Sequence, residues 1–415
     1  MTRRVAFIVS KFPCYDEAFI LREMYALSKR MEIFIFSLRK SKEKMIHDEA
    51  RELLGQVVYI PYLFSWSTVS ANIGAFLFHP VRYVRALLHL IVGNMKSPEF
   101  LTKSLAFFPK AVYLAEWAKK KKVDHMHAYW ATYPASVAMV ASEISRVPFS
   151  FTGHAHDIYV DTTCLGRKMQ HASFVSTCTR QNKEHLLKVA GTANGTFSKS
   201  INWSERILVN HHGVELDKFV ANGRQRSRTF QILSVGTLHD YKGFQYLIPA
   251  LGRLKDKGID FRSVIVGGGP LESDLRRHIR LLNLEPYVVM TGPLKQNEVL
   301  PYYKTSDLFV LMAQPEWHWG IPNVLVESLA AKTPVITTRF GSVEELVQNG
   351  ETGLIVPPKD PAELANAIER LCQDEELRRR LAETGHRSVV ERFNLNKNIE
   401  VFRERLCRGN AALVS

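Results

Sequence analysis

The chain alternates short apolar runs, rich in β-branched residues, with amphipathic helical stretches from end to end. In the first half of its 415 residues the apolar runs are Val5–Val9, Ile33–Leu38, Val57–Ile60, Val123–His127, Phe149–Thr152, Phe174–Thr177 and Ile207–Val209. Strands that are apolar throughout are typical of a parallel sheet, which helices cover on both faces. The first half is therefore predicted to be an α/β unit.

The alternation stops after Asn210 and resumes at Ile232. The residues between them are polar, include glycines and spaced arginines, and show no apolar period, which is typical of a linker. The later runs are Ile232–Val235, Val264–Val266, Val288–Met290, Leu308–Leu311, Val335–Thr337 and Leu354–Val356. We therefore expect a first lobe over 1–212, a linker over 213–229, a second lobe over 230–390, and a C-terminal helix within 391–415 that crosses back to the first lobe.

The predicted fold class is α/β, with two Rossmann-like doubly wound lobes that face each other across a cleft. In open parallel sheets, ligands bind outside the carboxyl ends of the strands. The length fits two lobes, because ordinary domains have about 100 to 200 residues. Hydrophobic residues make up 46% of the chain and charged residues 23%, a composition that excludes a disordered or fibrous protein.

A formal net charge of +14 indicates an anionic partner. Between residues 76 and 122, basic and aromatic or apolar residues alternate at helical spacing. The set is Arg82, Arg85, Lys96, Lys103, Lys110 and Lys119–Lys122 with Phe76, Phe78, Tyr83, Leu87, Leu88, Phe107, Phe108 and Trp117. This mixture suits a helix pair at an anionic membrane surface better than a nucleic-acid groove. A solvated basic face over a buried apolar stripe is the alternative.

No membrane-spanning helix or disulfide framework is expected. The apolar stretch near the N-terminus ends at Lys11, which is too early for a signal peptide, and residues 72–93 are interrupted by Pro80 and by basic side chains. The five cysteines form no Cys-x-x-Cys pair. These features predict a cytoplasmic protein.

Three sequence features point to a phosphate-bearing ligand. Gly267–Gly269 follow a strand and precede a helix, so backbone N–H groups could face a diphosphate, although glycine could equally be needed for the turn alone. The full dinucleotide fingerprint is lacking. Lys242 begins a helix just after a strand and could reach phosphates, or it could be an inert surface lysine. Glu327 lies among apolar residues and could accept two ribose hydroxyls, or bond to nearby backbone.

The histidine pairs carry no further ligand at a recognisable spacing, so no metal site is expected. The pairs are His125 with His127, His154 with His156, and His211 with His212.

Several segments resemble a known family. ILSVGTLHDYKG, VIVGGGPLESDLRR, VVMTGPL, YYKTSDLFVLMA and WGIPNVLVESLAAKTPVITTRFGSVEELVQNGETGLIVPPKDPAELANAI resemble, in order, the donor-lobe motifs of the family-4 retaining glycosyltransferases of the GT-B fold. KFPCYDEAFILREMYAL resembles the opening of the exopolysaccharide, capsule and lipopolysaccharide members, and FTGHAHDIY resembles their acceptor-lobe histidine motif. The resemblance covers nearly the whole chain and keeps the order of the motifs.

The resemblance implies transfer from a nucleotide diphosphate sugar to a glycan or lipid-linked acceptor, without metal or other cofactor, in bacterial surface polysaccharide synthesis. It implies that Lys242 contacts the diphosphate, that Glu327 binds the ribose and that His154 lies near the sugar ring. The remaining donor-side positions are Thr237, Gly268, Gly269, Gly292, Leu294, Glu316, Trp319, Gly320, Ile321, Pro322 and Asn323, with Gly292–Leu294 at the nucleobase and Gly320–Pro322 offering backbone N–H groups.

Two positions depart from the family pattern. Thr237 stands where the family has an arginine, and Trp319 stands where it has the first of two paired glutamates. Glu316 or His318 could replace that glutamate, or Trp319 could stack on a sugar. These departures keep two alternatives open, a catalytically inactive scaffold of the same fold that binds a partner, and a nucleotide-sugar epimerase.

On the acceptor side, we expect contacts from Asp16 and Glu17, in the loop after the first strand, and from His127, at the end of its strand. Asp16 and Glu17 could instead cap the helix that follows them. No nucleophile is evident, so we expect a front-face reaction in which the leaving phosphate helps to deprotonate the acceptor.

Overall fold

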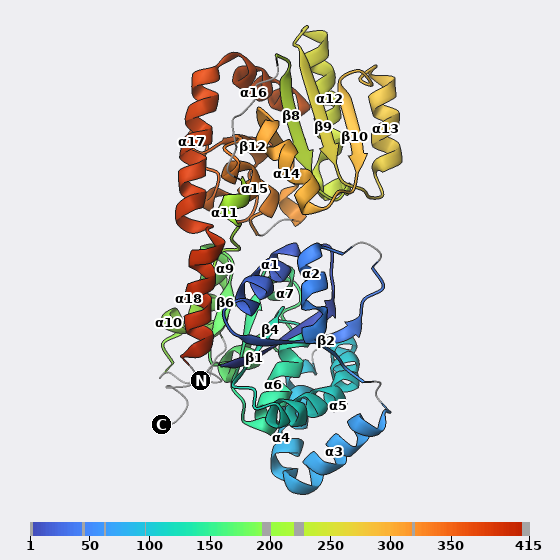
Figure 1. The fold of residues 1–415 in the computed structure, drawn as a ribbon, viewed down its shortest axis with the longest axis vertical. Helices are drawn as coiled ribbons and strands as arrows, with labels where there is room; N and C mark the ends of the chain where they lie inside the picture. The colour runs from blue at the N-terminus through green and yellow to red at the C-terminus, as the bar shows by residue number, and fades with distance from the viewer. Residues whose placement is uncertain are drawn as a thin grey trace. The chain divides into compact units, whose positions relative to one another are not determined.

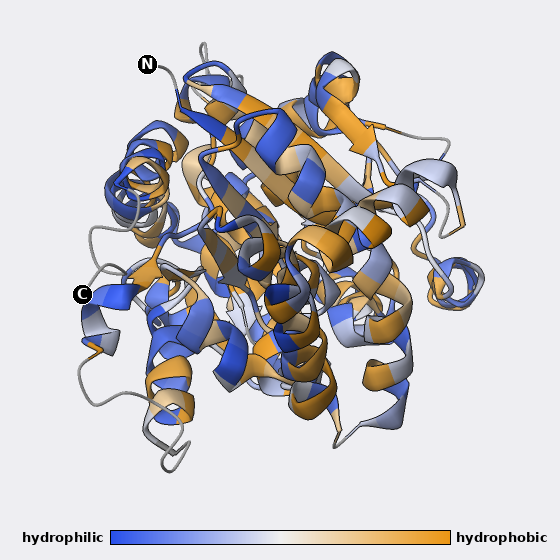
Figure 2. Cartoon of the chain, turned by 90° about the horizontal axis from the view of Figure 1, so that it is seen from below, coloured by the Kyte–Doolittle hydropathy of each residue, from blue (hydrophilic) through white to orange (hydrophobic). Residues whose placement is uncertain are grey.

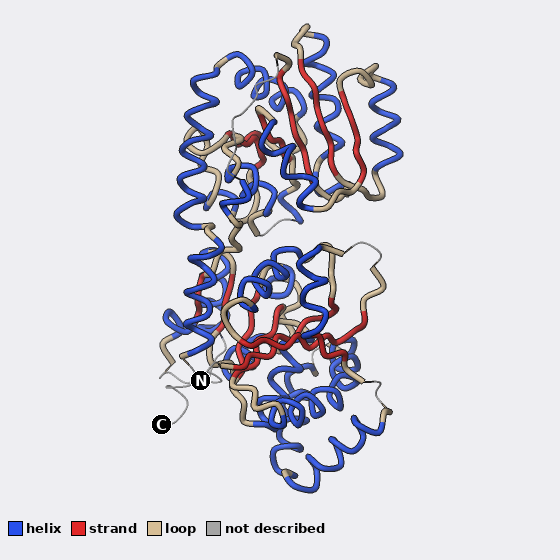
Figure 3. The backbone as a smooth tube through the Cα atoms, in the orientation of Figure 1, coloured by secondary structure: helices blue, strands red, loops and turns tan. Residues whose placement is uncertain are grey.

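The computed structural model describes residues 3–43, 46–61, 64–95, 97–192, 201–219, 228–317 and 320–408. The chain forms two compact units (Figure 1). The first contains the residues up to His211 and those from Ile399 onward, and the second contains His212–Asn398. Each unit is a parallel sheet with helices around it (Figure 3).

The sheet of the first unit has the strand order β3-β2-β1-β4-β5-β6-β7. The strands are β1 (Arg4–Phe12), β2 (Glu32–Lys40), β3 (Val57–Tyr59), β4 (His125–Tyr129), β5 (Phe149–Gly153), β6 (Val175–Thr177) and β7 (Ile207–Val209). Val5 pairs with Ile33 on one side and with His125 on the other, so β1 is central. Its residues from Val5 to Val9 are almost fully buried, as a strand covered on both faces requires.

The helices of the first unit are α1 (Ala18–Ser28), α2 (Asp48–Leu53), α3 (Trp66–Phe78), α4 (Pro80–Asn94), α5 (Pro98–Lys120), α6 (Tyr133–Ser145), α7 (His156–Tyr159), α8 (Leu165–His171), α9 (Arg180–Thr192) and α10 (Trp203–Arg206). Small residues such as Ala111, Ala115 and Ala138 let α5 and α6 pack closely against one another. The strands are largely hydrophobic and the helices carry both kinds of residue (Figure 2).

The sheet of the second unit has the order β10-β9-β8-β11-β12-β13. The strands are β8 (Phe230–Val235), β9 (Phe261–Val266), β10 (Val288–Gly292), β11 (Leu308–Leu311), β12 (Val335–Thr338) and β13 (Leu354–Val356). The helices are α11 (Leu216–Phe219), α12 (Phe244–Asp256), α13 (Glu272–Leu281), α14 (Gln296–Thr305), α15 (Asn323–Ala330), α16 (Pro361–Gln373) and α17 (Glu375–Arg392). Two buried clusters, one on each face, form its core. The prediction of two parallel α/β lobes is confirmed.

The segment predicted as a linker, 213–229, is in part built into the second unit. Val214 and Phe219 are buried in its core, and the Val214 N–H donates to the Phe393 carbonyl oxygen at 2.9 Å. Residues 220–227 of that segment lie outside the described ranges. The burial of these two side chains was not predicted, because two apolar residues in a polar stretch make no periodic pattern.

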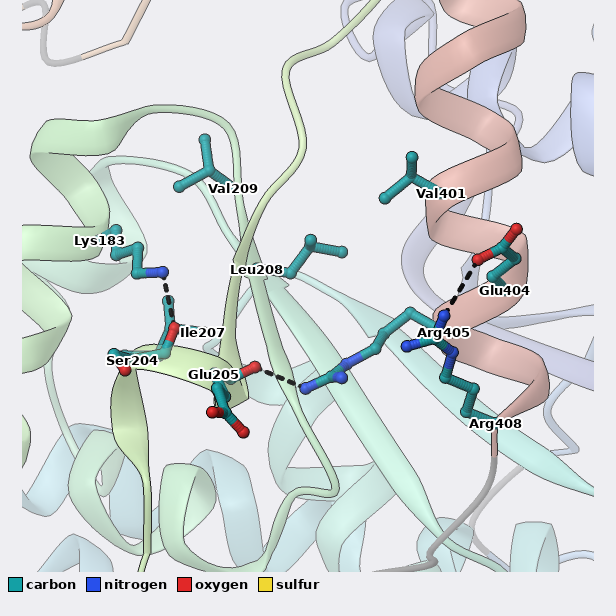
Figure 4. A pocket seen from close by; sticks show the side chains of 10 residues that line it. All are labelled: Lys183, Ser204, Glu205, Ile207, Leu208, Val209, Val401, Glu404, Arg405 and Arg408. Atoms are coloured by element: carbon teal, nitrogen blue, oxygen red, sulfur yellow. Dashed lines mark hydrogen bonds and ion pairs between the residues drawn. The ribbon is translucent and has the colours of Figure 1, made fainter.

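The C-terminal helix α18 (Leu395–Cys407) begins in the second unit and continues into the first. Phe402 packs edge-on against His127 at 5.0 Å between ring centroids and also contacts Phe174. A hollow of about 280 Å³ lies between α18 and the edge strand β7 (Figure 4). Arg405 there donates to the Glu205 carbonyl oxygen at 2.6 Å, so this hollow is part of the seam that ties α18 to the first unit.

Candidate functional site

The strand order of the second unit reverses between β8 and β11, and this switch point is where open α/β sheets bind ligands. The loop after β8 contains Thr237 and Lys242, and the loop after β11 leads to α15. The two loops are joined directly, because the Gln314 N–H donates to the Tyr241 carbonyl oxygen at 2.8 Å. The residues predicted to hold a donor therefore follow adjacent strands.

Gly243 makes the close approach of these two loops possible. Its φ is +76°, and a Cβ at this position would lie 1.9 Å from the Met312 carbonyl oxygen. Any larger residue would push the loop after β8 away from the end of β11. The turn that Gly243 allows starts α12 directly after Lys242.

Lys242 lies half-buried at the end of the loop after β8. It ends the short 3₁₀ turn Asp240–Lys242, and its side chain runs past Gly236, where a Cβ would contact the Lys242 Cδ at 3.8 Å. Burial lowers the pKa of Lys242 to about 8. A poorly solvated ammonium group at a switch point is suited to a strongly anionic ligand.

Glu327 is buried on α15, with 8% of its surface exposed. Its Oε1 accepts a hydrogen bond from the Gln296 Nε2, on α14, at 3.2 Å. A side-chain partner on a second helix fixes the carboxylate more firmly than a solvent-exposed position would. The expected placement between apolar neighbours is thus found.

The start of α15 carries three of the predicted donor-side positions, Ile321, Pro322 and Asn323. Pro322 occupies the N-cap position and makes no side-chain cap bond, while Asn323 is the first residue of the helix. Asn323, named above as a donor-side position, therefore lies in the first turn of α15 and is not its N-cap. Gly320 has open space where a Cβ would be, and Ile321 packs against the core together with Leu294.

The glycine turn after β9 is required by backbone packing. A Cβ at Gly267, whose φ is +145°, would lie 1.8 Å from the Gly236 carbonyl oxygen, and one at Gly269 would lie 2.7 Å from that of Leu238. The Gly268 carbonyl oxygen accepts from the Leu238 N–H at 3.0 Å. These contacts favour the geometric explanation of the turn, and donor contacts by Gly268 and Gly269 stay a prediction.

The remaining donor-side positions are placed as follows. Gly292, with φ +78°, ends β10, and open space surrounds its Cβ position. Glu316 is exposed and pairs with Lys359, with 3.1 Å between Oε1 and Nζ. Trp319 and His318 lie outside the described residues. Thr237 is half-buried in the loop after β8.

The sheet of the first unit reverses between β1 and β4, so it has its own switch point. Glu17 follows β1, Trp130 follows β4 and His154 follows β5. The Trp130 Nε1–H donates to the Glu17 Oε1 at 3.0 Å, and the His154 ring lies 4.4 Å from the Trp130 ring, measured between centroids. Glu17 and His154 were predicted from the sequence as site residues, whereas Trp130 was not.

Glu17 occupies the N-cap position of α1 but makes no side-chain cap bond, so its carboxylate is free of that structural task. Burial raises the pKa of Glu17 to about 7, against the opposing effect of the Trp130 hydrogen bond. Asp16 beside it is exposed.

Asp157 and Lys168 hold the loops that carry Trp130 and His154. Asp157 Oδ1 accepts from the His154 N–H at 2.9 Å, and its Oδ2 accepts from the Ala131 N–H at 2.7 Å. The buried Lys168 Nζ donates to the Ala131 carbonyl oxygen at 2.7 Å. Within the described ranges no group of three His, Cys, Asp or Glu side chains could hold a metal ion.

His127 does not line a cleft, contrary to the prediction. It is fully buried in the sheet, where its ring bonds to the Ser150 and Thr152 hydroxyls at 2.7 and 2.9 Å. Burial holds the pKa of His127 well below its usual range. The error has a simple cause, since α18, from the far end of the chain, covers the face on which His127 lies.

Comparison with known proteins identifies the second unit. A family profile described as "Glycosyl transferases group 1" matches residues 217–388, which include Thr237, Lys242 and Glu327. The second unit belongs to the group 1 glycosyl transferases. The family resemblance of the motifs in this unit is thereby confirmed.

The curated relatives that this chain resembles include several glycosyltransferases. It is 33% identical over 165 residues to alpha-D-kanosaminyltransferase of Streptomyces kanamyceticus, a match that spans 40% of this chain and 42% of that protein. It is 27% identical to the putative teichuronic acid biosynthesis glycosyltransferase TuaC of Bacillus subtilis, over 66% of this chain and 68% of TuaC. It is 33% identical to the putative colanic acid biosynthesis glycosyltransferase WcaL of Escherichia coli, over 41% and 43% of the two chains.

Solved structures extend the likeness to both units. A glycosyltransferase from Rickettsia africae has a TM-score of 0.70 at 20% identity, over 98% of this chain and 99% of that one. Anabaena HepE, solved with UDP, has a TM-score of 0.70 at 18% identity, over 98% and 100%. At such identities the likeness shows the fold alone, which is the GT-B fold that the sequence predicted.

Proposed function

We propose that this chain moves a sugar from a nucleotide diphosphate sugar to a glycan or lipid-linked acceptor, with retention of configuration and without a metal, in the synthesis of a bacterial surface polysaccharide. One observation carries the proposal. A half-buried ammonium group, Lys242, and a buried carboxylate, Glu327, belong to the elements that follow β8 and β11, on the two sides of the switch point of a group 1 unit.

Lys242 supplies the charge that the reaction needs. Breaking the bond between the anomeric carbon and the diphosphate oxygen places negative charge on the leaving group, and a preorganised cation stabilises it. With a pKa of about 8, Lys242 is mostly protonated at neutral pH. Because Thr237 carries no charge where the family has an arginine, Lys242 bears more of this task.

In the proposed reaction the acceptor hydroxyl oxygen forms the new bond on the face that the diphosphate leaves. The hydroxyl proton passes to an oxygen of the departing phosphate, so that no side-chain base is required. Glu327 accepts hydrogen bonds from the ribose hydroxyls, and Gln296 keeps its carboxylate in place. His154, in the first unit, contacts the transferred sugar.

The proposal is tested by measuring the thermal unfolding of the protein in the presence of each of a panel of nucleotide sugars. A donor at a hundredfold excess over its Kd adds about 2.7 kcal/mol to the stability of the folded protein. We expect such a shift with one class of donor. A shift without sugar transfer, accompanied by free epimerised nucleotide sugar, would favour an epimerase. The absence of a shift with every donor would favour an inactive scaffold.

We also propose that the first unit contacts the anionic inner surface of the cell membrane through α3 and α4. The large apolar side chains of these helices are unusually exposed, with Trp66 at 81%, Phe78 at 79% and Val81 at 75%. Patches of this kind mark interaction surfaces. Among the described helices none could span a membrane alone, and α3 with α4, which together reach the necessary length and hydropathy, bend by 113°.

The basic and aromatic stretch between residues 76 and 122 had two explanations, a membrane-surface helix pair and a solvated basic face over a buried apolar stripe. Each explanation fits a different part of the stretch. On α5, Phe108 is buried and Trp117 packs against Phe34 with 5.1 Å between ring centroids, so this helix has a buried apolar stripe. On α3 and α4, by contrast, Phe76, Phe78 and Leu88 are exposed, while Tyr83 and Leu87 pack against the core. Arg85 already pairs with Glu143, so it is less available to an anionic lipid. The membrane contact that we propose therefore depends mainly on the exposed apolar side chains of α3 and α4, which we call the apolar ridge.

A further inference from the structure

An aromatic cluster lies at the carboxyl edge of the first sheet, at its switch point. The rings of Trp130, Phe19 and His154 contact one another, with centroids 4.4 Å apart for Trp130 and His154, 5.2 Å for Phe19 and His154, and 6.3 Å for Phe19 and Trp130. His154 is buried, whereas Trp130 and Phe19 are only half-buried. The cluster therefore offers aromatic surface to solvent at the place where such sheets bind ligands.

The backbone of Trp130 is held in an unfavourable conformation. Its φ is +82°, a value that bulky residues rarely adopt. Its N–H donates to the Thr152 carbonyl oxygen at 3.0 Å, and the next residue is held by Asp157 and Lys168. Strain that the surroundings enforce in this way is concentrated at functional sites. Core packing alone would not require an indole that remains partly in solvent.

A carboxylate fixes the orientation of the indole. Glu17 Oε1 accepts the Trp130 Nε1–H, which locks the ring plane and leaves Oε2 for another donor. The charge of Lys11 acts on Glu17, and Lys11 itself pairs with Glu43, with 2.5 Å between Nζ and Oε1. The site thus joins a flat apolar surface with one oriented carboxylate, a combination typical of pockets for small polar ligands.

We propose that Trp130 is the platform for the acceptor sugar: a pyranose ring lies with its C–H face on the indole and donates a hydroxyl hydrogen bond to Glu17. This inference rests on the proposed function and names the class of acceptor, a chain ending in a pyranose. The faces of pyranose rings carry C–H groups that pack on aromatic rings, while the equatorial hydroxyls point outward to carboxylates. His154 packs beneath the platform and aligns it.

The test uses the full-length protein and four probes, the methyl pyranosides of glucose, galactose, mannose and N-acetylglucosamine, with binding measured by saturation-transfer NMR. We expect the wild type to bind at least one of them and Trp130→Ala to weaken that binding at least tenfold. Trp130→Phe, which keeps a ring but lacks the Nε1–H, should fall between the two. Trp203→Phe, on α10, is the matched control and should bind as the wild type does.

Donor binding separates this inference from the proposed function. The Trp130 variants should keep the thermal shift that a nucleoside diphosphate gives, because Lys242 and Glu327, the proposed contacts of the diphosphate and the ribose, lie in the second unit. Wild-type protein that binds none of the four glycosides, or Trp130→Ala that binds them normally, would overturn the inference. If no nucleotide sugar shifts the thermal unfolding of the wild type, the proposed function is overturned. Glycoside binding that depends on Trp130 would then still be an independent result.

Discussion

At the scale of single residues, the chemistry of the second unit depends on the protonation of Lys242. Burial favours the neutral amine and brings the pKa to about 8, so the group is charged at pH 7 and mostly neutral at pH 9. An anionic ligand must therefore bind together with a proton when the pH exceeds the pKa. The cost grows tenfold in affinity for each pH unit above it.

We predict that the Kd for a nucleoside diphosphate rises between pH 7 and pH 9 in the wild type. Lys242→Arg should show a flatter profile, because a guanidinium group stays charged over this range. Calorimetric titration at pH 7, 8 and 9 measures both profiles. Lys304→Arg, on α14, is the control and should follow the wild type. Equal slopes for wild type and Lys242→Arg would remove Lys242 from the phosphate site.

The roles of Lys242 and Glu327 could be proposed from the sequence because each follows directly on a strand or a turn with a readable pattern. The role of Trp130 could not be proposed in this way. No pattern near it in the sequence indicates a positive φ or a hydrogen bond to a residue 113 positions away. His127 was misplaced for a related reason. Its burial depends on Phe402, a contact between segments far apart that no local pattern encodes.

At the scale of elements, helices of similar composition differ in whether their apolar residues are buried or exposed. The strands were predicted to within a few residues, because continuous apolar runs leave few alternatives. The helices α3 and α5 could not be distinguished in this way. Both carry apolar and basic residues, and only the fold decides that the stripe of α5 faces the sheet while the ridge of α3 and α4 faces outward.

We predict that the double variant Phe78→Ser with Val81→Ser loses binding to vesicles that contain anionic phospholipid. The reason is the loss of apolar area that would otherwise enter the bilayer interface. Cosedimentation measures the bound fraction. Leu281→Ser, which alters an equally exposed leucine of the second unit, should bind as the wild type does. Unchanged sedimentation of the double variant would contradict the membrane proposal.

At the scale of the whole molecule, the chain consists of two α/β units, each with a switch point that carries chemically capable side chains. In the second unit these are Lys242 and Glu327, and in the first they are Glu17, Trp130 and His154. How the two sets meet around a donor and an acceptor stays a prediction. If one unit binds the donor and the other the acceptor, substitutions in the second unit should change donor binding and substitutions in the first should change acceptor binding.

The most direct measurement of the central claim is the turnover of a nucleotide sugar by the full-length protein, with the anomeric configuration of the product read by NMR. We expect the wild type to release nucleoside diphosphate and to form a glycoside of the same configuration as the donor. We also expect Glu327→Gln to lower kcat/KM for the donor at least tenfold, whereas Glu363→Gln, on α16, should leave it unchanged. A product of inverted configuration, or full activity in Glu327→Gln, would contradict the claim.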